Sequence, residues 1–200
     1  DHSDVQFLAG WRNGRAGAYR DVRRAVVHPD YVYDGAVSAE RVRNDLALLE
    51  LERPIQNTTI VPFATAALPR PGDSVGVVSY ARDRSEAPSL QEVCTVLAKQ
   101  EGMLVTSCSV DFGSSGAPIF TFQYGEPQIV SVVSAKAMVQ GRKVSLGTNL
   151  TKPLDVLLGM LASGEAVMNS GATEPRRLSV GGNNGLALSG AEGGAKFVKP

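Results

Sequence analysis

The stretch SCSVDFGSSGAPIF, residues 107–120, places a Gly-Ser-Ser-Gly run inside sequence that otherwise favours β-strands. A tight turn is the simplest explanation, because glycine adopts backbone conformations that other residues resist. A second explanation is chemical: one serine would be a nucleophile, and the glycines would leave backbone N–H groups open to the carbonyl oxygen of a substrate. The surrounding sequence distinguishes the two.

Short runs of β-forming residues, separated by Gly, Pro and polar turns, follow one another from residue 5 to residue 150. They are DVQFLAGW, AVVHPDYVY, DLALLEL, SVGVVSY, QEVCTVLA, MLVTSCSV, APIFTF, QIVSVVSA and VSLGTNL. Short strands at this spacing, without helical periodicity between them, are typical of an antiparallel sandwich or barrel. We therefore expect an all-β fold.

One segment has helical periodicity. In TKPLDVLLGMLASG, residues 151–164, leucines recur every three or four positions, Thr151 can cap the start and Gly164 can end the helix. After Gly164 the chain is rich in glycine and has a single aromatic residue, Phe197. Such a composition cannot bury much surface, so we predict a flexible tail over residues 165–200.

Composition excludes several partners. The 20 basic and 20 acidic residues balance, so there is no electrostatic reason to expect nucleic acid or an anionic membrane. The arginines from Arg12 to Arg24 lack interleaved aromatic residues and are best explained as a solvated strand face. No apolar run approaches the ~20 residues needed to cross a bilayer, so we expect no membrane span.

The two cysteines, Cys94 and Cys108, lie in strand-like runs joined by KQEG, a favourable hairpin turn. Pairing of these strands would bring the sulfurs close, so we predict a disulfide and a secreted or periplasmic protein. Two buried free thiols are the alternative. Neither a CxxC motif nor a nearby histidine accompanies them, so we expect no metal, and we expect no cofactor.

Two motifs resemble a known family. VVHPDYVYDGAVSAERVRNDLALLELERPI, residues 26–55, resembles the segment of trypsin/chymotrypsin-like serine peptidases that carries the triad aspartate, where H-P-x-Y precedes N-D-[IL]-A-L-L-x-L. GSSGAPIF resembles the nucleophile loop G-D-S-G-G-P, in the form of bacterial glutamyl-endopeptidase-like members. The order, aspartate before serine, matches the chymotrypsin triad. The resemblance covers roughly residues 3–160.

The resemblance implies two antiparallel six-stranded β-barrels. Residues 1–66 would be the remainder of an N-terminal barrel lobe and residues 67–150 a C-terminal lobe, followed by a helix over 151–164 and the tail. The first barrel would be incomplete, because SDVQFLAGW resembles the strand that follows the catalytic histidine in the family. The resemblance also implies a monomer that acts on polypeptide substrates.

Carried over position by position, the resemblance assigns Asp45 as the acid that orients the catalytic imidazole and Ser115 as the nucleophile. The backbone N–H groups of Gly113 and Ser115 would form the oxyanion hole. Ser114 stands where many members have an aspartate that pairs with a newly cut N-terminus on activation. That switch is therefore missing here or performed differently.

Three further residues would contact substrate. Ser109 takes the position where trypsin-like members select basic side chains with an aspartate, so Arg/Lys specificity is not supported. Ser134 takes the place of the serine that contacts the triad acid, in a run, VVSAKA, that resembles the strand pairing with an extended substrate. Lys136 would lie near the pocket lip and favour an acidic side chain; a merely solvated lysine is the simpler alternative.

Neither histidine matches the family's catalytic one. His28 belongs to the structural H-P-x-Y run. His2 precedes Asp45 by 43 residues, close to the ~45 of the chymotrypsin triad, and stays an alternative, but the sequence around it does not resemble the family's histidine motif. We expect the catalytic histidine to precede Asp1, which would leave the chain nearly inactive because a serine without a base is a weak nucleophile. The alternatives are a peptidase-like binding or scaffold domain that has lost its chemistry, and a plain β-module with a coincidental GSSG turn.

Overall fold

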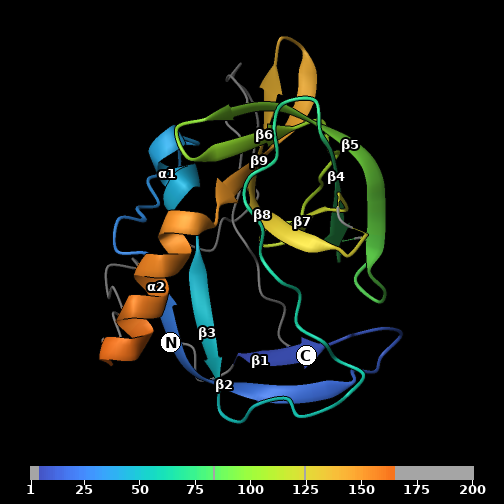
Figure 1. Ribbon diagram of the computed structural model, residues 1–200, viewed down its shortest axis with the longest axis vertical. Helices are drawn as coiled ribbons and strands as arrows, with labels where there is room; N and C mark the ends of the chain where they lie inside the picture. Colours follow the sequence, from blue (N-terminus) through green and yellow to red (C-terminus); the bar gives the residue numbers. More distant parts are fainter. Residues whose placement is uncertain (1–4, 83, 124, 165–200) are drawn as a thin grey trace, which may run out of the picture.

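Two β-sheets, one of them closed, account for most of the computed structural model, which describes residues 5–82, 84–123 and 125–164 (Figure 1). The larger sheet is a closed antiparallel barrel with the strand order β4-β5-β6-β9-β8-β7. This barrel corresponds to the predicted C-terminal barrel. Its strands are β4 (Ser74–Ser79), β5 (Ser89–Gln100), β6 (Met103–Thr106), β7 (Pro118–Thr121), β8 (Gln128–Val139) and β9 (Arg142–Asn149).

Two tight hairpins shape the barrel. Glu101 and Gly102 join β5 to β6 with positive φ angles of 49° and 81°, and Gln140 and Gly141 join β8 to β9 with 50° and 75°. Two consecutive residues with positive φ are the signature of the type I′ turn, whose twist matches that of the flanking strands. The predicted KQEG hairpin turn is therefore confirmed.

Cys94 and Cys108 form a disulfide inside the barrel, as predicted. Their Cα atoms are 4.8 Å apart, and both residues are 1% exposed and belong to the main apolar core. Cys108 follows β6 and begins the segment that leads to Ser115. The cross-link therefore ties the start of that segment to β5.

The second sheet has three antiparallel strands in the order β1-β2-β3. They are β1 (Gln6–Ala9), β2 (Ala18–Val27) and β3 (Ala47–Leu51). Within the described ranges this sheet does not close, so a second six-stranded barrel is not present there. The strand expected at AVVHPDYVY begins earlier and ends at Val27, because Pro29 lacks an N–H and Tyr31 N donates to His28 O in a turn.

Two helices flank the sheets. The short helix α1 (Ala39–Asn44) was not predicted; it begins where Ser38 Oγ accepts a 3.1 Å hydrogen bond from Arg41 N. The predicted C-terminal helix is α2 (Thr151–Ser163), and it ends at Gly164, whose φ is +78°. Thr151 does not cap it: Thr151 N donates to Asn149 Oδ1 instead.

Helix α2 lies along the three-stranded sheet and not on the barrel that precedes it in sequence (Figure 1). Leu157 and Met160 pack against Val26 of β2, and Pro153 is also buried. Leu158, which the leucine periodicity assigned to the same face, is 51% exposed. The buried stripe is therefore rotated toward Pro153 and Met160.

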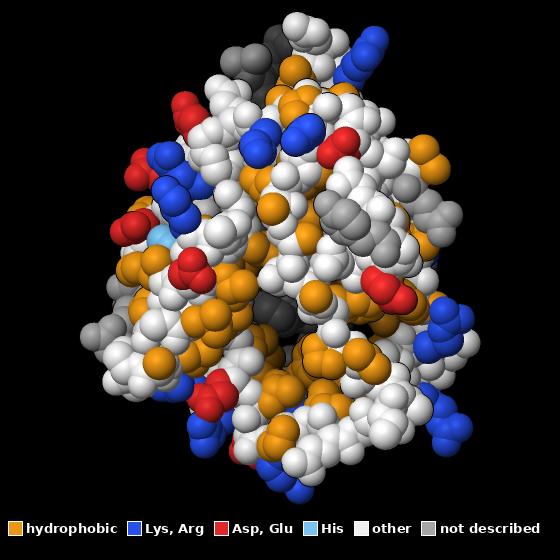
Figure 2. Space-filling model, viewed as in Figure 1, with side chains coloured by type: hydrophobic (Ala, Val, Ile, Leu, Met, Phe, Trp, Pro, Cys, Tyr) orange, Lys and Arg blue, Asp and Glu red, His pale blue; other side chains and the backbone are white. Residues whose placement is uncertain are grey.

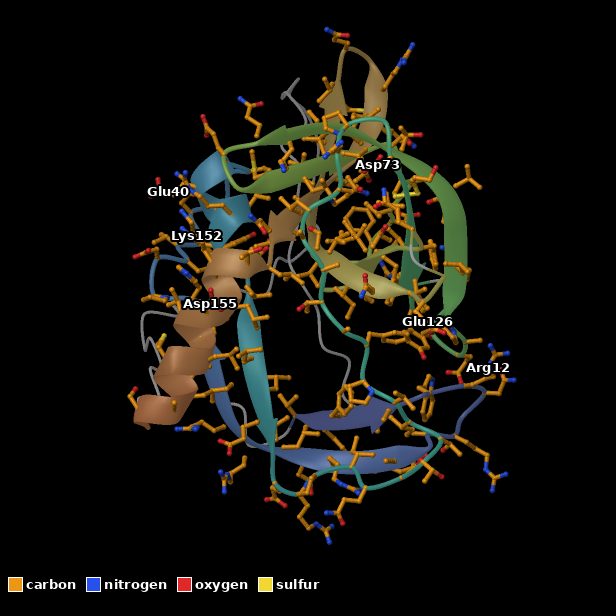
Figure 3. The ribbon with its side chains drawn as sticks, viewed as in Figure 1. Arg12, Glu40, Asp73, Glu126, Lys152 and Asp155 are labelled. Atoms are coloured by element: carbon orange, nitrogen blue, oxygen red, sulfur yellow. A yellow bond between two sulfur atoms is a disulfide. The ribbon has the colours of Figure 1, made fainter. Side chains whose placement is uncertain are left out.

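The connection between β1 and β2 joins the sheet to the barrel. Trp11 accepts a 2.7 Å hydrogen bond from Tyr80 Oη through its carbonyl, and its indole donates to Ser85 O. Asn13 N donates to Glu86 O. Arg12 points outward from the same connection (Figure 3).

The predicted division between residues 66 and 67 falls in the connection from β3 to β4, where Ala66 N donates to Ile129 O of β8. That boundary stays a prediction. The predicted tail, residues 165–200, lies outside the described residues. No helix in the described part of the chain is long and apolar enough to cross a membrane.

Arg24 connects the sheet to the end of α2. Its guanidinium donates to Leu161 O at 2.8 Å and to Glu50 Oε2 at 3.0 Å. We predict that Arg24→Met lowers the free energy of unfolding by about 1–2 kcal/mol, because charge-assisted hydrogen bonds to partly buried groups are lost. Arg23→Met is the control, since Arg23 also contacts Glu50 but is 62% exposed. Urea unfolding should show a smaller loss for Arg23→Met, below about 1 kcal/mol; equal losses would contradict the prediction.

Candidate active site

Asp45 lies at the end of α1, beside the barrel. The residue leaves the helix with φ −77° and ψ 70°, and its half-buried carboxylate faces β8. Ser134 Oγ, on β8, donates a 2.6 Å hydrogen bond to Asp45 Oδ2. The first half of the chain and the barrel therefore meet at this carboxylate.

A β-bulge directs Ser134 toward the aspartate. The pairing of β8 with β9 shifts register between Val133 and Ala135, so Ser134 is the extra residue of β8. Bulges turn a side chain out of the regular alternation of a strand. Ser134 is 4% exposed, and its hydroxyl donates its hydrogen bond to Asp45.

Burial raises the pKa of Asp45 above its usual range, while the hydrogen bond from Ser134 and the charge of Arg41 oppose the rise. Tyr31 responds to the same surroundings: burial, followed by the nearby charge of Asp45, raises its pKa. The carboxylate is therefore costly to ionise in this structure. An additional cation beside it would lower its pKa.

Ser115 occupies the tip of the turn between β6 and β7 and is half buried. Its hydroxyl has no hydrogen-bond partner in the described part of the chain. The next residue, Gly116, donates its N–H to Val133 O at 2.7 Å. Because Val133 precedes Ser134, the Ser115 turn and the Asp45 carboxylate are attached to neighbouring residues of β8.

The turn carrying Ser115 depends on Gly113. This residue has a φ of +90°, and a Cβ there would lie 3.0 Å from Arg82 N and 3.4 Å from Ala81 C. Arg82 N also donates to Phe112 O. The β4–β5 connection therefore packs directly against the backbone of the turn.

The backbone amides of the turn fall into two groups. Those of Ser114, Gly116 and Ala117 donate to Asp111, Val133 and Ser114 respectively. Those of Gly113 and Ser115 have no acceptor among the residues that the structure describes. These two N–H groups are the ones that the family resemblance assigned to an oxyanion hole.

Ser114, which replaces the acidic residue of many peptidases, is 1% exposed. Its hydroxyl donates to Ser79 Oγ at 3.3 Å. The turn is thus fastened to β4 by a neutral contact. No carboxylate is available at this position to pair with an amino terminus.

Ser109 is part of the segment before the turn, and Lys136, on β8, contacts the same segment. Ser109 is exposed, and its backbone N–H donates to Gln91 Oε1 at 2.9 Å. Lys136 Nζ is 3.6 Å from Asp111 Oδ1 and 3.6 Å from the centre of the Phe112 ring. Lys136 therefore contacts both residues while its side chain stays 39% exposed, and its role in substrate binding stays a prediction.

His28 serves the turn after β2. It is 7% exposed, its backbone N–H donates to Leu46 O, and its Nδ1 accepts from Asp30 N at 3.3 Å. His2 lies outside the described residues. No group of three or more His, Cys, Asp or Glu side chains suited to a metal occurs in the described ranges.

Two features of the site were missed from the sequence. Helix α1 places Asp45, and Arg41 from the same helix lies under the Tyr33 ring, 4.5 Å from its centre. The run SAERVRN contained a signal for the helix, since Ser38 is a favoured N-cap residue before helix-forming residues. Six residues are too few to show periodicity.

The raised pKa of Asp45 predicts a pH-dependent stability difference. A carboxyl group whose pKa is higher in the folded state binds protons more readily when folded, so its ionisation destabilises the fold above that pKa. Asp45→Asn keeps an acceptor for Ser134 without the charge. We expect it to be more stable than the wild type at pH 7, with the advantage shrinking as pH falls toward about 4, the unfolded pKa. Urea unfolding across this range measures the difference, and an advantage independent of pH would contradict the assignment.

Comparing alanine variants at Gly113 and Gly116 separates the cost of a positive φ angle from the cost of contact with the β4–β5 connection. Both have positive φ, +90° and +81°, but only at Gly113 would a Cβ meet other atoms within 4 Å. Each alanine variant should lose about 1–2 kcal/mol to backbone conformation. Gly113→Ala should lose more, because Arg82 N must also move. Equal unfolding free energies for the two variants would show that the β4–β5 connection does not constrain the turn.

Comparison with known families agrees with the geometry. A family model described as a trypsin-like peptidase domain matches residues 10–128, which include Asp45, Gly113 and Ser115. The match covers more than half of the 200 residues. No match was found among curated proteins. The chain belongs to the trypsin-like peptidase domain family.

Proposed function

We propose that this protein is a serine endopeptidase in which Ser115 is the nucleophile and Asp45 the acid of the triad. The observation that supports the proposal is that Asp45 and the Ser115 turn are bonded to neighbouring residues of β8, at the Ser134 bulge. Ser134 Oγ donates a 2.6 Å hydrogen bond to Asp45 Oδ2, and Gly116 N donates a 2.7 Å hydrogen bond to Val133 O. A half-buried carboxylate, and a turn whose Ser115 hydroxyl has no hydrogen-bond partner among the described residues, are thus both bonded to the same segment of β8.

The reaction begins when Ser115 Oγ attacks the carbonyl carbon of the scissile peptide bond and an imidazole takes the hydroxyl proton. The carbonyl oxygen becomes an oxyanion, which the N–H groups of Gly113 and Ser115 stabilise. Collapse of this intermediate breaks the C–N bond, and the imidazolium protonates the leaving amine. Water then hydrolyses the acyl-Ser115 ester through a second oxyanion.

Asp45 orients the imidazole and stabilises its protonated form. We assign the imidazole to a histidine in a segment that precedes Asp1, because His28 is committed to its own turn and the sequence around His2 does not resemble the family's histidine motif. Without that segment, residues 1–200 have little activity, because Ser115 keeps its proton at neutral pH.

Substrate binds as an extended strand along β8. Strand β7 pairs with β8 only as far as Val132, whereas β9 continues to Val139. From Ser134 onward, the side of β8 toward β7 has no strand partner in the described residues, and such an edge accepts an extended peptide. Ser109 and Lys136 contact the side chain before the scissile bond, and Lys136 favours an acidic one.

The finer assignment is a monomeric, secreted or periplasmic enzyme of the glutamyl-endopeptidase-like branch. The disulfide supports an oxidising compartment. The neutral Ser114–Ser79 contact supports a nucleophile loop that does not need a newly cut N-terminus. Lys136, already paired with Asp111, is a cation placed for a substrate carboxylate.

A serine-reactive phosphonate tests the proposal on the full-length protein, including the residues before Asp1. Ser115 should be labelled in the wild type, and Ser115→Ala should abolish labelling. Asp45→Asn should slow casein cleavage by about 10⁴-fold, because the imidazole loses its orienting partner. Neither labelling nor cleavage by the wild type would refute the peptidase assignment.

A peptidase-like binding or scaffold domain is the second candidate. It is favoured by one observation: the single histidine of the described residues, His28, is buried and structural. If the residues before Asp1 supply no histidine, this candidate replaces the first.

A further inference from the structure

Thr148, on β9, contacts the segment that carries Asp45. The residue is fully buried, and its Oγ1 donates a 2.6 Å hydrogen bond to Val42 O. The same hydroxyl lies 3.2 Å from Asp45 O. Val42 belongs to the last turn of α1, so one hydroxyl of the barrel holds the end of the helix and the aspartate backbone. Figure 1 shows α1 lying against the barrel at β6 and β9.

The barrel presents Thr148 and Ser134 on adjacent strands. In the β8–β9 ladder, Val132 pairs with Thr148 and Val133 with Gly147, immediately before the bulge at Ser134. A Cβ at Gly147 would collide with the Ser131 side chain and lie 3.2 Å from Val132 O, so only glycine allows this close approach. The two hydroxyls therefore reach Asp45 from one rigid part of the barrel.

We propose that Thr148 is a positioning residue that fixes the backbone of Asp45 while Ser134 fixes its carboxylate. This inference rests on the proposed peptidase function and extends it to a residue that does not touch substrate. Asp45 leaves the helix at ψ 70°, outside helical geometry. The hydrogen bond to Val42 O pins the turn immediately before that departure, and so sets where the carboxylate lies relative to Ser115.

Loss of the hydroxyl leaves Val42 O buried without its strong donor. Among the described residues, the one other donor found for Val42 O is Asp45 N, at 3.4 Å, which makes a long hydrogen bond. The end of α1 must then shift to recover a partner, and Asp45 shifts with it. A displacement of about 1 Å in a catalytic group lowers the rate by about 10²-fold.

The competing explanation is that Thr148 only stabilises the barrel. Thr106 provides a control: it is also fully buried on a barrel strand, its Oγ1 is 2.6 Å from Ser145 Oγ, and the same atom accepts a 3.2 Å hydrogen bond from Cys108 N. Among the described residues, no hydrogen bond joins Thr106 to Asp45 or Val42. Thr106→Val and Thr148→Val each replace one buried hydroxyl by a methyl group.

The first experiment does not depend on activity. Urea unfolding of Thr148→Val, Ser134→Ala and the double variant tests whether the two losses are coupled. We expect the double variant to lose less stability than the sum of the single losses, and the difference to disappear in an Asp45→Ala background. The same cycle with Thr106→Val should be additive. Additive losses for Thr148, or coupling that persists without Asp45, would overturn the inference.

The second experiment measures phosphonate labelling of Ser115 in the full-length protein. Thr148→Val should lower the maximal labelling rate by about 10²-fold, with the half-saturating probe concentration unchanged. Thr148→Ser, which keeps the hydroxyl, should restore the rate to within a few-fold. Thr106→Val should label at the wild-type rate.

The outcomes separate the two proposals. Equal labelling by the Thr148→Val and Thr106→Val variants shows that Thr148 has a structural role only, and overturns the inference. Absence of labelling in the wild type refutes the proposed function. The stability cycle then still decides whether Thr148 and Ser134 hold Asp45 together.

Discussion

The hydrogen bond between Ser134 Oγ and Asp45 Oδ2 connects the two parts of this molecule at the candidate site. A carboxylate that loses part of its hydration is unfavourable unless a donor replaces the lost water. Ser134 is such a donor, but it belongs to the barrel, whereas Asp45 follows a helix built from the first half of the chain. The pairing therefore fixes how the two halves meet, and it does so at the strand that also anchors the Ser115 turn.

The turn around Ser115 is held from three sides. The disulfide fixes the segment before it, the β4–β5 connection packs against Gly113, and β8 accepts the N–H of Gly116. The N–H groups of Gly113 and Ser115 have no acceptor among the described residues, whereas those of Ser114 and Ala117 are satisfied within the turn and that of Gly116 by β8. Such preorganised donors are what stabilisation of an oxyanion requires.

The closed barrel has a continuous apolar core, and both sheets also expose large apolar side chains. On the three-stranded sheet these include Phe7 and Leu49, at 43% and 42% exposure, and on the barrel Val93 and Met138, at 85% and 62%. Figure 2 shows hydrophobic side chains gathered in the middle of the face of the molecule that is in view, between the regions where Figure 1 places the barrel and the three-stranded sheet. On its other face the sheet is covered by α2, through Val26 and Leu157.

Local sequence determined much of this protein. Short runs of β-forming residues between Gly, Pro and polar turns located most strands, KQEG specified the hairpin that brings Cys94 near Cys108, and Gly164 ended α2. These features depend on a residue and its near neighbours, so they can be read without a structure. Tertiary packing decided the rest: that Ser134 lies in a bulge, that α1 forms over six residues, and that Thr148 reaches Val42. These features depend on which distant segments share a surface. A serine or threonine hydroxyl can be either exposed or buried, and only the fold decides which carbonyl or carboxylate lies within hydrogen-bond reach of it.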